Sequence, residues 1–303
     1  MEASMGESTR ESVLVTGAGG GLGLETALTL AGRGFRVFAG VRDASQWEGV
    51  GQAASERGVR VDVVPLDVED ETSIAAALDG IVATTGGLFG VVNNAARTLR
   101  GYFEDLEEEE VRQVFEVNLF GTMRVIRHAL PLLRGSGRGR IVVMSSIAGR
   151  VGSPGVSAYV ATKFALEGFA ESLALETAPL GIRVAIIEPG IVATSIWAKN
   201  RRVAALARNP TRPYHAWFRR AESEADKLVR TSTVTPADVA NGVLRALTDP
   251  RPRLRYTIGR RASLVITLRR YLPGELFERL YFGEVLRRIT GRRRFAAPGR
   301  TVS

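Results

Sequence analysis

The chain has 303 residues, of which 45% are hydrophobic and 24% are charged, and this composition excludes an intrinsically disordered protein. It contains no cysteine, which excludes disulfide bonds and cysteine-ligated zinc, and its two histidines, His128 and His215, are too far apart in sequence to suggest a metal site. The formal net charge is +9 at pH 7, and no apolar stretch reaches the ~18–20 residues that a membrane span needs, so we expect a cytoplasmic protein.

A strand, a glycine-rich turn and a helix follow one another near the N-terminus. Residues 13–16 form a β-branched apolar run that predicts a buried strand, and residues 24–31 have helical spacing. The turn between them has glycines at Gly17, Gly21 and Gly23, which is the spacing of a dinucleotide-binding turn. We expect Gly17 to permit the tight turn, Gly21 to let the backbone approach a pyrophosphate, and Gly23 to let helix and strand pack closely.

Strand-like and helical segments alternate along most of the chain. Strands are predicted at residues 13–16, 36–40, 60–65, 88–93, 139–145, 182–188 and 255–258, and the helices between them include 103–130, 158–178 and 236–248. This alternation predicts an α/β fold, a Rossmann doubly wound parallel sheet of about seven strands with helices on both faces. We expect a flexible tail over residues 1–11 and a single domain over 12–258, with a lid insert at about 195–235 and a helical extension over 259–303.

The end of the second predicted strand indicates which nicotinamide cofactor fits. In sheets that bind NAD, an acidic residue there accepts hydrogen bonds from the adenosine ribose. Here the strand ends in Val41-Arg42-Asp43, so Arg42 can pair with the 2′-phosphate of NADP and Val41 does not repel it. We therefore expect NADP(H) to be favoured over NAD(H). Two alternatives stay open: Asp43 fills the acidic role one or two residues late, or Arg42 is a solvated loop charge.

Tyr159 and Lys163 are the pair with the clearest chemical meaning. The chain has 38 arginines but only three lysines, and chance gives a Tyr-x-x-x-Lys spacing roughly 0.06 times per chain of this composition. Positions i and i+4 share a helix face, so the ammonium group can lie beside the phenol. A fixed cation favours the phenolate and lowers the phenol pKa from its ordinary ~10. The alternative is an incidental surface pair.

Together these motifs resemble the short-chain dehydrogenase/reductase family, in its standard single-domain branch, from residue 12 to about 195. The matching residues, in chain order, are the turn from Thr16 to Gly23, Asp67-Val68, Asn93-Asn94-Ala95-Ala96, Asn118, Ser145-Ser146, Tyr159 with Lys163, and Pro189-Gly190 with Thr194. Ala96 stands where the family usually has a glycine. The end of the second strand and the extended C-terminus are similar in style to the hydroxysteroid and retinol dehydrogenases of the family.

The resemblance implies reversible hydride transfer between NAD(P)(H) and a carbonyl or a secondary alcohol. Tyr159 would exchange a proton with the substrate oxygen, and Lys163 would lower the phenol pKa and hold the nicotinamide ribose. Ser146 would polarise the carbonyl; Ser145 is the competing candidate, and the family spacing to the tyrosine selects Ser146. Asn118 is a poor helix former inside a predicted helix, and it would kink that helix and hold a water between Lys163 and solvent.

The resemblance also implies a set of cofactor contacts and no metal. Asp67 would bind the adenine edge, although an aspartate at a strand end can equally cap the next helix. Asn93 would tie neighbouring strands together, and Ile191 and Thr194 would contact the nicotinamide carboxamide. The implied set is Gly17, Gly21, Leu22, Gly23, Arg42, Asp67, Val68, Asn94, Ala95, Tyr159, Lys163, Pro189, Gly190, Ile191 and Thr194.

The insert bears on the substrate, which the resemblance implies is a small molecule. Its aromatic residues could make an apolar pocket or could simply pack a lid, and they include Trp197, Tyr214, Trp217 and Phe218. Residues 97–101 and 151–156 should form the other walls. We expect a bulky apolar ketone or alcohol as the substrate. The main alternative function is a non-catalytic dinucleotide-binding sensor or scaffold, a class that commonly lacks the tyrosine or the lysine.

The C-terminal extension carries essentially all of the basic excess. Residues 251–303 hold 14 arginines and three acids, a net charge of +11, whereas residues 1–250 carry 27 basic and 29 acidic side chains, a net charge of −2. Apolar residues alternate with arginines over 264–289, which predicts an amphipathic element. It could pack over the cleft, lie at the interface of a homodimer or homotetramer, or rest on an anionic membrane. No recognition motif supports nucleic-acid binding.

Overall fold

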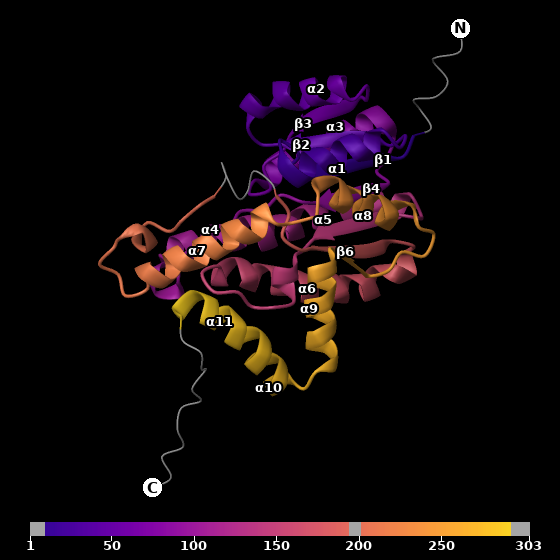
Figure 1. Ribbon diagram of the computed structural model, residues 1–303. Helices are drawn as coiled ribbons and strands as arrows, with labels where there is room; N and C mark the ends of the chain where they lie inside the picture. The colour runs from indigo at the N-terminus through magenta and orange to yellow at the C-terminus, as the bar shows by residue number, and fades with distance from the viewer. Residues whose placement is uncertain (1–9, 194–200, 292–303) are drawn as a thin grey trace.

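In the part of the chain that the structure describes, residues 10–193 and 201–291, seven parallel strands form one sheet with helices on both faces (Figure 1). The structure is a computed structural model, and its strand order is β3-β2-β1-β4-β5-β6-β7. The strands are β1 (Ser12–Thr16), β2 (Arg36–Val41), β3 (Val61–Pro65), β4 (Gly90–Asn93), β5 (Arg140–Met144), β6 (Arg183–Pro189) and β7 (Arg255–Ile258). The strand order reverses between β1 and β4, and this is where a doubly wound sheet opens a crevice at its carboxyl edge.

Alternate residues of each strand pack against opposite layers of helices, because successive side chains point to opposite faces of a sheet. Leu14 and Ile141 face the layer of α3, α5 and α6, whereas Val13 and Val142 face the layer of α1, α2 and α8. Burial on both faces explains why the strands read as continuous apolar runs. These helices are α1 (Gly21–Ala31), α2 (Trp47–Glu56), α3 (Glu71–Thr85), α5 (Thr122–Gly135), α6 (Ser157–Thr177) and α8 (Pro236–Thr248).

The helix predicted over residues 103–130 is divided, which the sequence pattern did not indicate. It consists of a short 3-10 turn, η2 (Phe103–Asp105), then α4 (Glu108–Phe115), a π-helical segment, η3 (Glu116–Gly121), and α5. Glu107 starts α4 anew through a capping box with Glu110. Asn118 lies in the π-helical segment, a type of irregularity that occurs frequently at functional sites.

The insert contains a helix, and the C-terminal extension packs against it. This helix is α7 (His215–Arg230). The extension is helical, as expected, and its last helix packs against α7, where Arg220 donates a hydrogen bond of 3.4 Å to the carbonyl oxygen of Ile289. The helices of the extension are α9 (Arg260–Tyr271), α10 (Gly274–Phe277), η8 (Glu278–Phe282) and α11 (Gly283–Thr290).

Candidate active site

The predicted residues gather at the carboxyl edge of the sheet. β1 leads into the glycine-rich turn, β4 leads into Asn94 and Ala95, β5 leads into Ser146, and β6 ends at Pro189. Because the carboxyl ends of parallel strands share one edge, residues far apart in sequence meet there.

The backbone of the glycine-rich turn passes so close to neighbouring atoms that Gly17 and Gly23 have no room for a side chain. Gly17 has a φ of +64°, and a Cβ atom there would lie 2.8 Å from the Cα atom of Ala95. A Cβ atom at Gly23 would lie 2.3 Å from the carbonyl oxygen of Gly17. Gly23 therefore lets the turn fold back on itself and meet Asn94, rather than serving helix–strand packing alone. Gly21, the first residue of α1, also has a positive φ, of +57°.

Thr16 fixes this turn to the loop after β4, a role that we did not expect from the sequence. Its hydroxyl oxygen accepts hydrogen bonds from the backbone N–H groups of Asn94 and Ala95, both at 3.0 Å. The side-chain amide of Asn94 donates to the carbonyl oxygens of Thr16 and Gly17, at 3.0 and 3.1 Å. The side chain of Asn93 does not connect neighbouring strands as expected, because its buried side-chain amide group has no hydrogen-bond partner among the described residues.

The residues around the turn fit the pyrophosphate of a dinucleotide. Gly20 is the N-cap of α1, and within the described chain neither a side-chain cap nor an acidic residue occupies the first turn of this helix. The backbone N–H groups of Gly21, Leu22 and Gly23 have no partner within the helix and lie at the positive end of its dipole. Backbone N–H groups in this arrangement are well suited to bind an anion such as a pyrophosphate.

Ser146, Tyr159 and Lys163 lie together at the carboxyl end of β5. The Nζ atom of Lys163 lies 5.6 Å from the centroid of the Tyr159 ring and donates a hydrogen bond of 2.6 Å to the carbonyl oxygen of Met144. Burial raises the pKa of Tyr159 to about 12, while a hydrogen bond with Ser146 lowers it in part. The sequence predicted a lowered pKa; the direction is opposite because the phenolate loses water on burial.

Burial acts on the ammonium group as well. It lowers the pKa of Lys163 to about 8, and the carboxylate of Glu167, one helical turn further along α6, opposes that shift. A lysine with this pKa changes its charge close to neutral pH, which is characteristic of functional sites.

Ser145 and Ser146 have different surroundings. Ser146 accepts a hydrogen bond of 3.1 Å from the backbone N–H of Ala148 and interacts with the Tyr159 hydroxyl. Ser145 is buried, and its hydroxyl oxygen has no hydrogen-bond partner among the described residues; it lies on the side of Glu167, whose carboxyl pKa is raised by burial. The geometry therefore brings Ser146, and not Ser145, to the tyrosine.

Asn118 is fully buried and links three segments. Its Oδ1 atom accepts a hydrogen bond of 2.7 Å from the backbone N–H of Arg97, and its Nδ2 atom donates to the carbonyl oxygen of Arg97 at 3.0 Å. The same Nδ2 atom donates to the hydroxyl of Thr162 at 3.1 Å. Asn118 thus connects the π-helical segment to the loop after β4 and to the residue that precedes Lys163.

Charged groups meet at the carboxyl edge of the sheet, after β2, β3 and β4. The Oε2 atom of Glu69 accepts hydrogen bonds from Arg42 at 3.3 Å and from Arg97 at 2.9 Å. Asp67 does not cap the following helix: its Oδ1 atom accepts from the backbone N–H of Glu69 at 3.0 Å, and Asp70 is the N-cap of α3. Asp43 instead caps the 3-10 turn η1 (Ala44–Gln46) through Ser45, which lowers the pKa of its carboxyl.

Val68, Gly190 and Ile191 support the site through packing and backbone contacts. Val68 is buried, and a Cβ atom added at Gly121 would lie 2.8 Å from its side chain. The backbone N–H of Gly190 donates to Ile258 at 2.9 Å, and the carbonyl oxygen of Ile191 accepts from the Ser232 hydroxyl. Thr194 and Trp197, both expected near the nicotinamide or the substrate, lie outside the described residues.

Backbone hydrogen bonds join the expected wall at residues 97–101 to the insert and to the other expected wall, residues 151–156. Arg100 donates to Arg202 at 3.0 Å and accepts from Ala204 at 2.9 Å, and Gly101 donates to Gly155 at 2.9 Å. Phe218 is buried in a small apolar cluster with Leu99, Val114, Ala204 and Ala207, while Tyr214 stacks on Tyr102 with ring centroids 5.1 Å apart. The described aromatic residues therefore pack the insert against the wall.

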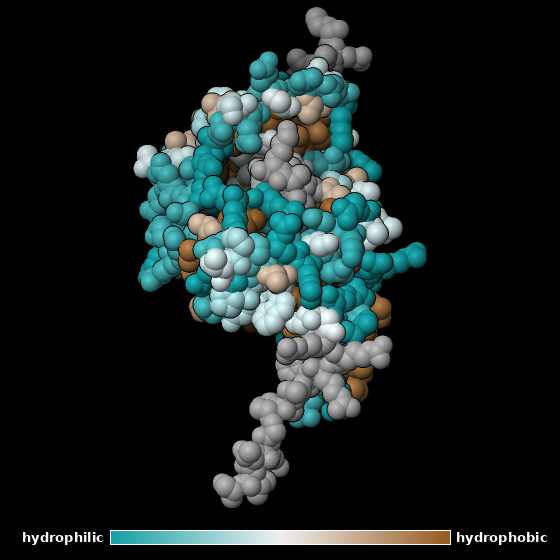
Figure 2. Space-filling view, turned by 60° about the vertical axis from the view of Figure 1, so that its left-hand side comes forward, coloured by the Kyte–Doolittle hydropathy of each residue, from teal (hydrophilic) through white to brown (hydrophobic). Residues whose placement is uncertain are grey.

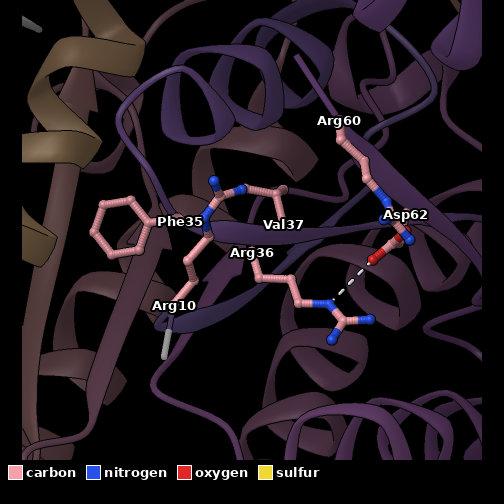
Figure 3. A pocket seen from close by; sticks show the side chains of 6 residues that line it. All are labelled: Arg10, Phe35, Arg36, Val37, Arg60 and Asp62. Carbon is pink, nitrogen blue, oxygen red and sulfur yellow. Dashed lines mark hydrogen bonds and ion pairs between the residues drawn. The ribbon is translucent and has the colours of Figure 1, made fainter. Parts of the chain in front are cut away.

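Figure 3 shows a small cavity that does not belong to this site. It lies at the amino ends of β2 and β3, where Asp62 pairs with Arg36 at 3.3 Å and with Arg60 at 3.4 Å. Its volume, about 20 Å³, suits about one water molecule and not a cofactor. The described residues contain no cluster of metal-ligating side chains, and none of their helices has the length and apolarity needed to cross a bilayer.

Comparison with known proteins defines the class that this fold and site suggest. Residues 11–204 match the sequence profile of the family described as short chain dehydrogenase. The chain is 34% identical to human 17-beta-hydroxysteroid dehydrogenase type 1 over 87% of its own length and 79% of that protein, and 35% identical to human retinol dehydrogenase 8 over 85% and 84%. A crystal structure of a short-chain dehydrogenase from Streptomyces avermitilis superposes with a TM-score of 0.74 at 30% identity, covering 93% of this chain and 98% of that one.

The chain therefore belongs to the short-chain dehydrogenase/reductase family of oxidoreductases, whose members use NAD(P) and small-molecule substrates. The predicted family and the predicted fold class, a Rossmann-like sheet with C-terminal helices, are both confirmed.

Proposed function

We propose that this protein is an NADP(H)-dependent oxidoreductase that interconverts a carbonyl and a secondary alcohol on a bulky apolar molecule. The observation that carries the proposal is the arrangement of Ser146, Tyr159 and Lys163 at the carboxyl end of β5, on the same edge of the sheet as the glycine-rich turn. A sensor or scaffold does not need a buried phenol that interacts with a serine and lies next to a lysine of shifted pKa. The non-catalytic alternative is therefore the weaker one.

Each group has a distinct part in this proposal. The nicotinamide, when bound, supplies or accepts the hydride, and the protein orients the reacting groups. Tyr159 stays protonated well above neutral pH, so it can give a proton to a carbonyl oxygen. Ser146 donates a hydrogen bond to the same oxygen, and Lys163 stabilises the negative charge that Tyr159 acquires.

The proposed preference for NADP(H) is supported by Arg42. Its guanidinium group lies at the carboxyl end of β2, and Val41 occupies the place where an acidic residue would repel a 2′-phosphate. Asp43 is engaged by Ser45, which disfavours it as the ribose-binding acid.

The apolar substrate is supported by the relatives and by the composition of the insert. The two human relatives are named for steroid and retinol substrates. Residues 201–218 contribute Val203, Ala204, Ala207 and Phe218 to an apolar cluster with Leu99 of the predicted wall.

We also propose a cytoplasmic protein that forms a homodimer or homotetramer, and whose helices α9, α10 and η8 either provide a packing surface for the cleft or the oligomer interface, or touch anionic membranes. Brown, hydrophobic atoms are visible at the lower right of the molecule in Figure 2, and the exposed apolar residues of the extension are Leu264, Leu268, Tyr271, Leu276 and Leu280. Exposed arginines lie on the same helices, including Arg260, Arg261, Arg269, Arg270 and Arg279. Apolar side chains mixed with arginines suit the interface of an anionic bilayer. Packing over the cleft or an oligomer interface is the competing role of this surface.

The proposed reaction is tested with the purified full chain, NADPH and a panel of carbonyl compounds. The panel begins with steroids, retinoids and medium-chain ketones, and NADPH oxidation is the readout. We expect turnover with at least one apolar carbonyl and none with the Tyr159→Phe variant. Tight NADP(H) binding without turnover in either direction, across the whole panel, would favour the sensor function instead.

A further inference from the structure

Glu69 lies between two arginines that come from different parts of the chain. Arg42 follows β2 and Arg97 follows β4, while Glu69 follows β3. One carboxylate oxygen of Glu69, Oε2, accepts hydrogen bonds from both guanidinium groups, at 3.3 and 2.9 Å. The three side chains thus define a small anion-binding position at the adenosine end of the site.

Hydrogen bonds to the backbone hold two of the three residues, Arg97 and Glu69, in place. Asn118 bonds both backbone groups of Arg97, and the side chain of Arg97 is only 19% exposed. The turn that presents Glu69 is fixed because its backbone N–H donates to Asp67. Arg42 is 52% exposed, so it is the more mobile partner.

The charges around this position favour a more highly charged anion than a carboxylate. Arg42 and Arg202 are each close enough to Arg97 to influence it electrostatically, and the acids that act on Arg97 are Glu69 and Asp67. A phosphate monoester carries about −1.5 to −2 charges at pH 7 and has three acceptor oxygens. It can accept from two guanidinium groups at once, with geometry that a single carboxylate oxygen does not match.

We propose that Glu69 occupies, in the ligand-free protein, the place between Arg42 and Arg97 that the 2′-phosphate of a bound adenosine takes. Arg97 is then a second residue of the phosphate subsite, and Glu69 is an internal competitor that weakens the binding of 2′-phosphorylated ligands. This inference rests on the proposed dinucleotide function and adds two specificity-determining residues to it.

The Glu69→Gln variant should bind the phosphorylated ligand more tightly. Glutamine keeps the size of the side chain but removes the charge that competes with the phosphate. We expect the Kd of adenosine 2′,5′-bisphosphate to fall about tenfold and the Kd of ADP to change less than about threefold. Both ligands lack the nicotinamide, so isothermal titration calorimetry with the full chain reports on this end of the site alone.

Variants at Arg97 should act in the opposite direction. Arg97→Gln should raise the Kd of the bisphosphate about tenfold, and Arg97→Lys should raise it less, because the charge remains while the two-pronged geometry is lost. The backbone bonds to Asn118 survive in both variants, since they do not involve the Arg97 side chain. Glu284→Gln is the matched control: Glu284 also pairs with two arginines, on α11, and should leave both Kd values unchanged.

The outcomes separate this inference from the function on which it rests. If the wild-type protein binds neither ligand, the dinucleotide site is wrong and the inference falls with it. If the wild-type protein binds both ligands but Glu69→Gln leaves the ratio of their Kd values unchanged, Glu69 is not a competitor and the inference alone is overturned. A ratio that shifts toward the bisphosphate by about tenfold in Glu69→Gln, but not in Glu284→Gln, supports it.

Discussion

The ammonium group of Lys163 donates its hydrogen bond to the carbonyl oxygen of Met144, the last residue of β5, at 2.6 Å. The lysine is therefore positioned by the sheet itself rather than by a carboxylate. Because a carbonyl group carries no full charge, it compensates little for the lost hydration of the ammonium, and this agrees with the lowered pKa of about 8. The chemistry of the site depends on keeping that buried charge.

Removal of the Tyr159 hydroxyl should abolish turnover. Tyr159→Phe deletes the proton donor but keeps the ring, so we expect kcat to fall by about 10²–10⁴ or more while the Kd for NADPH changes little. Lys163→Arg should also impair kcat, because a guanidinium does not match the compact geometry of the ammonium. Steady-state kinetics and fluorescence titration of NADPH measure the two quantities. A near-normal kcat in Tyr159→Phe would contradict the proposed mechanism.

The rate of carbonyl reduction should fall as the pH rises through about 8. The pKa of Lys163 is lowered to about 8, so its ammonium loses the proton above that value, whereas Tyr159, with a pKa of about 12, stays protonated. Glu167→Gln removes a carboxylate that raises the pKa of Lys163, and the alkaline limb should therefore move to lower pH. Profiles of kcat/KM against pH for the wild type, Glu167→Gln and the exposed control Glu171→Gln test this. If the alkaline limbs of the wild type and both variants coincide, this prediction is contradicted.

Arg42→Ala should lower the preference for NADP(H). A charge-assisted bond from one arginine to a phosphate contributes about 1.5–3 kcal/mol, so the ratio of the Kd values of NAD and NADP should fall about tenfold or more. The Kd of NAD itself should stay nearly constant. If the ratio does not change when the arginine is removed, Arg42 is not the selector.

Asn118→Ala should destabilise the fold as well as the site. It removes three hydrogen bonds and leaves the backbone groups of Arg97 without their partners. We expect the free energy of unfolding to fall by about 2–4 kcal/mol, measured by urea denaturation. Asn241→Ala, an exposed change on α8, should alter it by less than about 0.5 kcal/mol. Equal effects of the two substitutions would argue against the linking role of Asn118.

Charged substitutions on α9 and η8 should weaken membrane binding. Leu264 and Leu280 are both 58% exposed, so a glutamate at either position should not disturb the core. Sedimentation with phosphatidylglycerol-containing vesicles should show salt-sensitive binding of the wild type and at least a severalfold loss in Leu264→Glu and Leu280→Glu. Leu175→Glu changes a leucine that is 77% exposed on α6 and is the control. Absence of binding at low salt would leave packing or an oligomer interface as the role of this surface.

The strands could be predicted from the sequence because their buried apolar runs are continuous. Each of the seven lies within about two residues of its predicted range, and α8 has the predicted bounds because Thr235 and Pro236 mark its start. The break before α4 and the π-helical segment were missed, since neither has a strong signal in local propensity.

The parts of the site that were missed depend on contacts across the chain. Thr16 bonds residues 78 and 79 positions away, and Glu69 meets Arg97 across 28 positions. The only local signs of these contacts in the sequence were the hydroxyl of Thr16 next to the glycine-rich turn and Arg97 directly after Ala96. The direction of the Tyr159 pKa shift was also wrong, because desolvation depends on how the site packs and not on the Tyr-x-x-x-Lys spacing.

The ladder that joins residues 100–101 to residues 155 and 202–204 has a consequence for how the protein can change. Its hydrogen bonds run between backbone groups, so they do not depend on the side chains next to them, although Gly101 must stay small because a Cβ atom there would lie 2.7 Å from Leu106. Replacements at Tyr102 or Val203 would change the packing against the cluster around Phe218 while these backbone bonds stay in place. The wall and the insert are therefore held together independently of those two side chains.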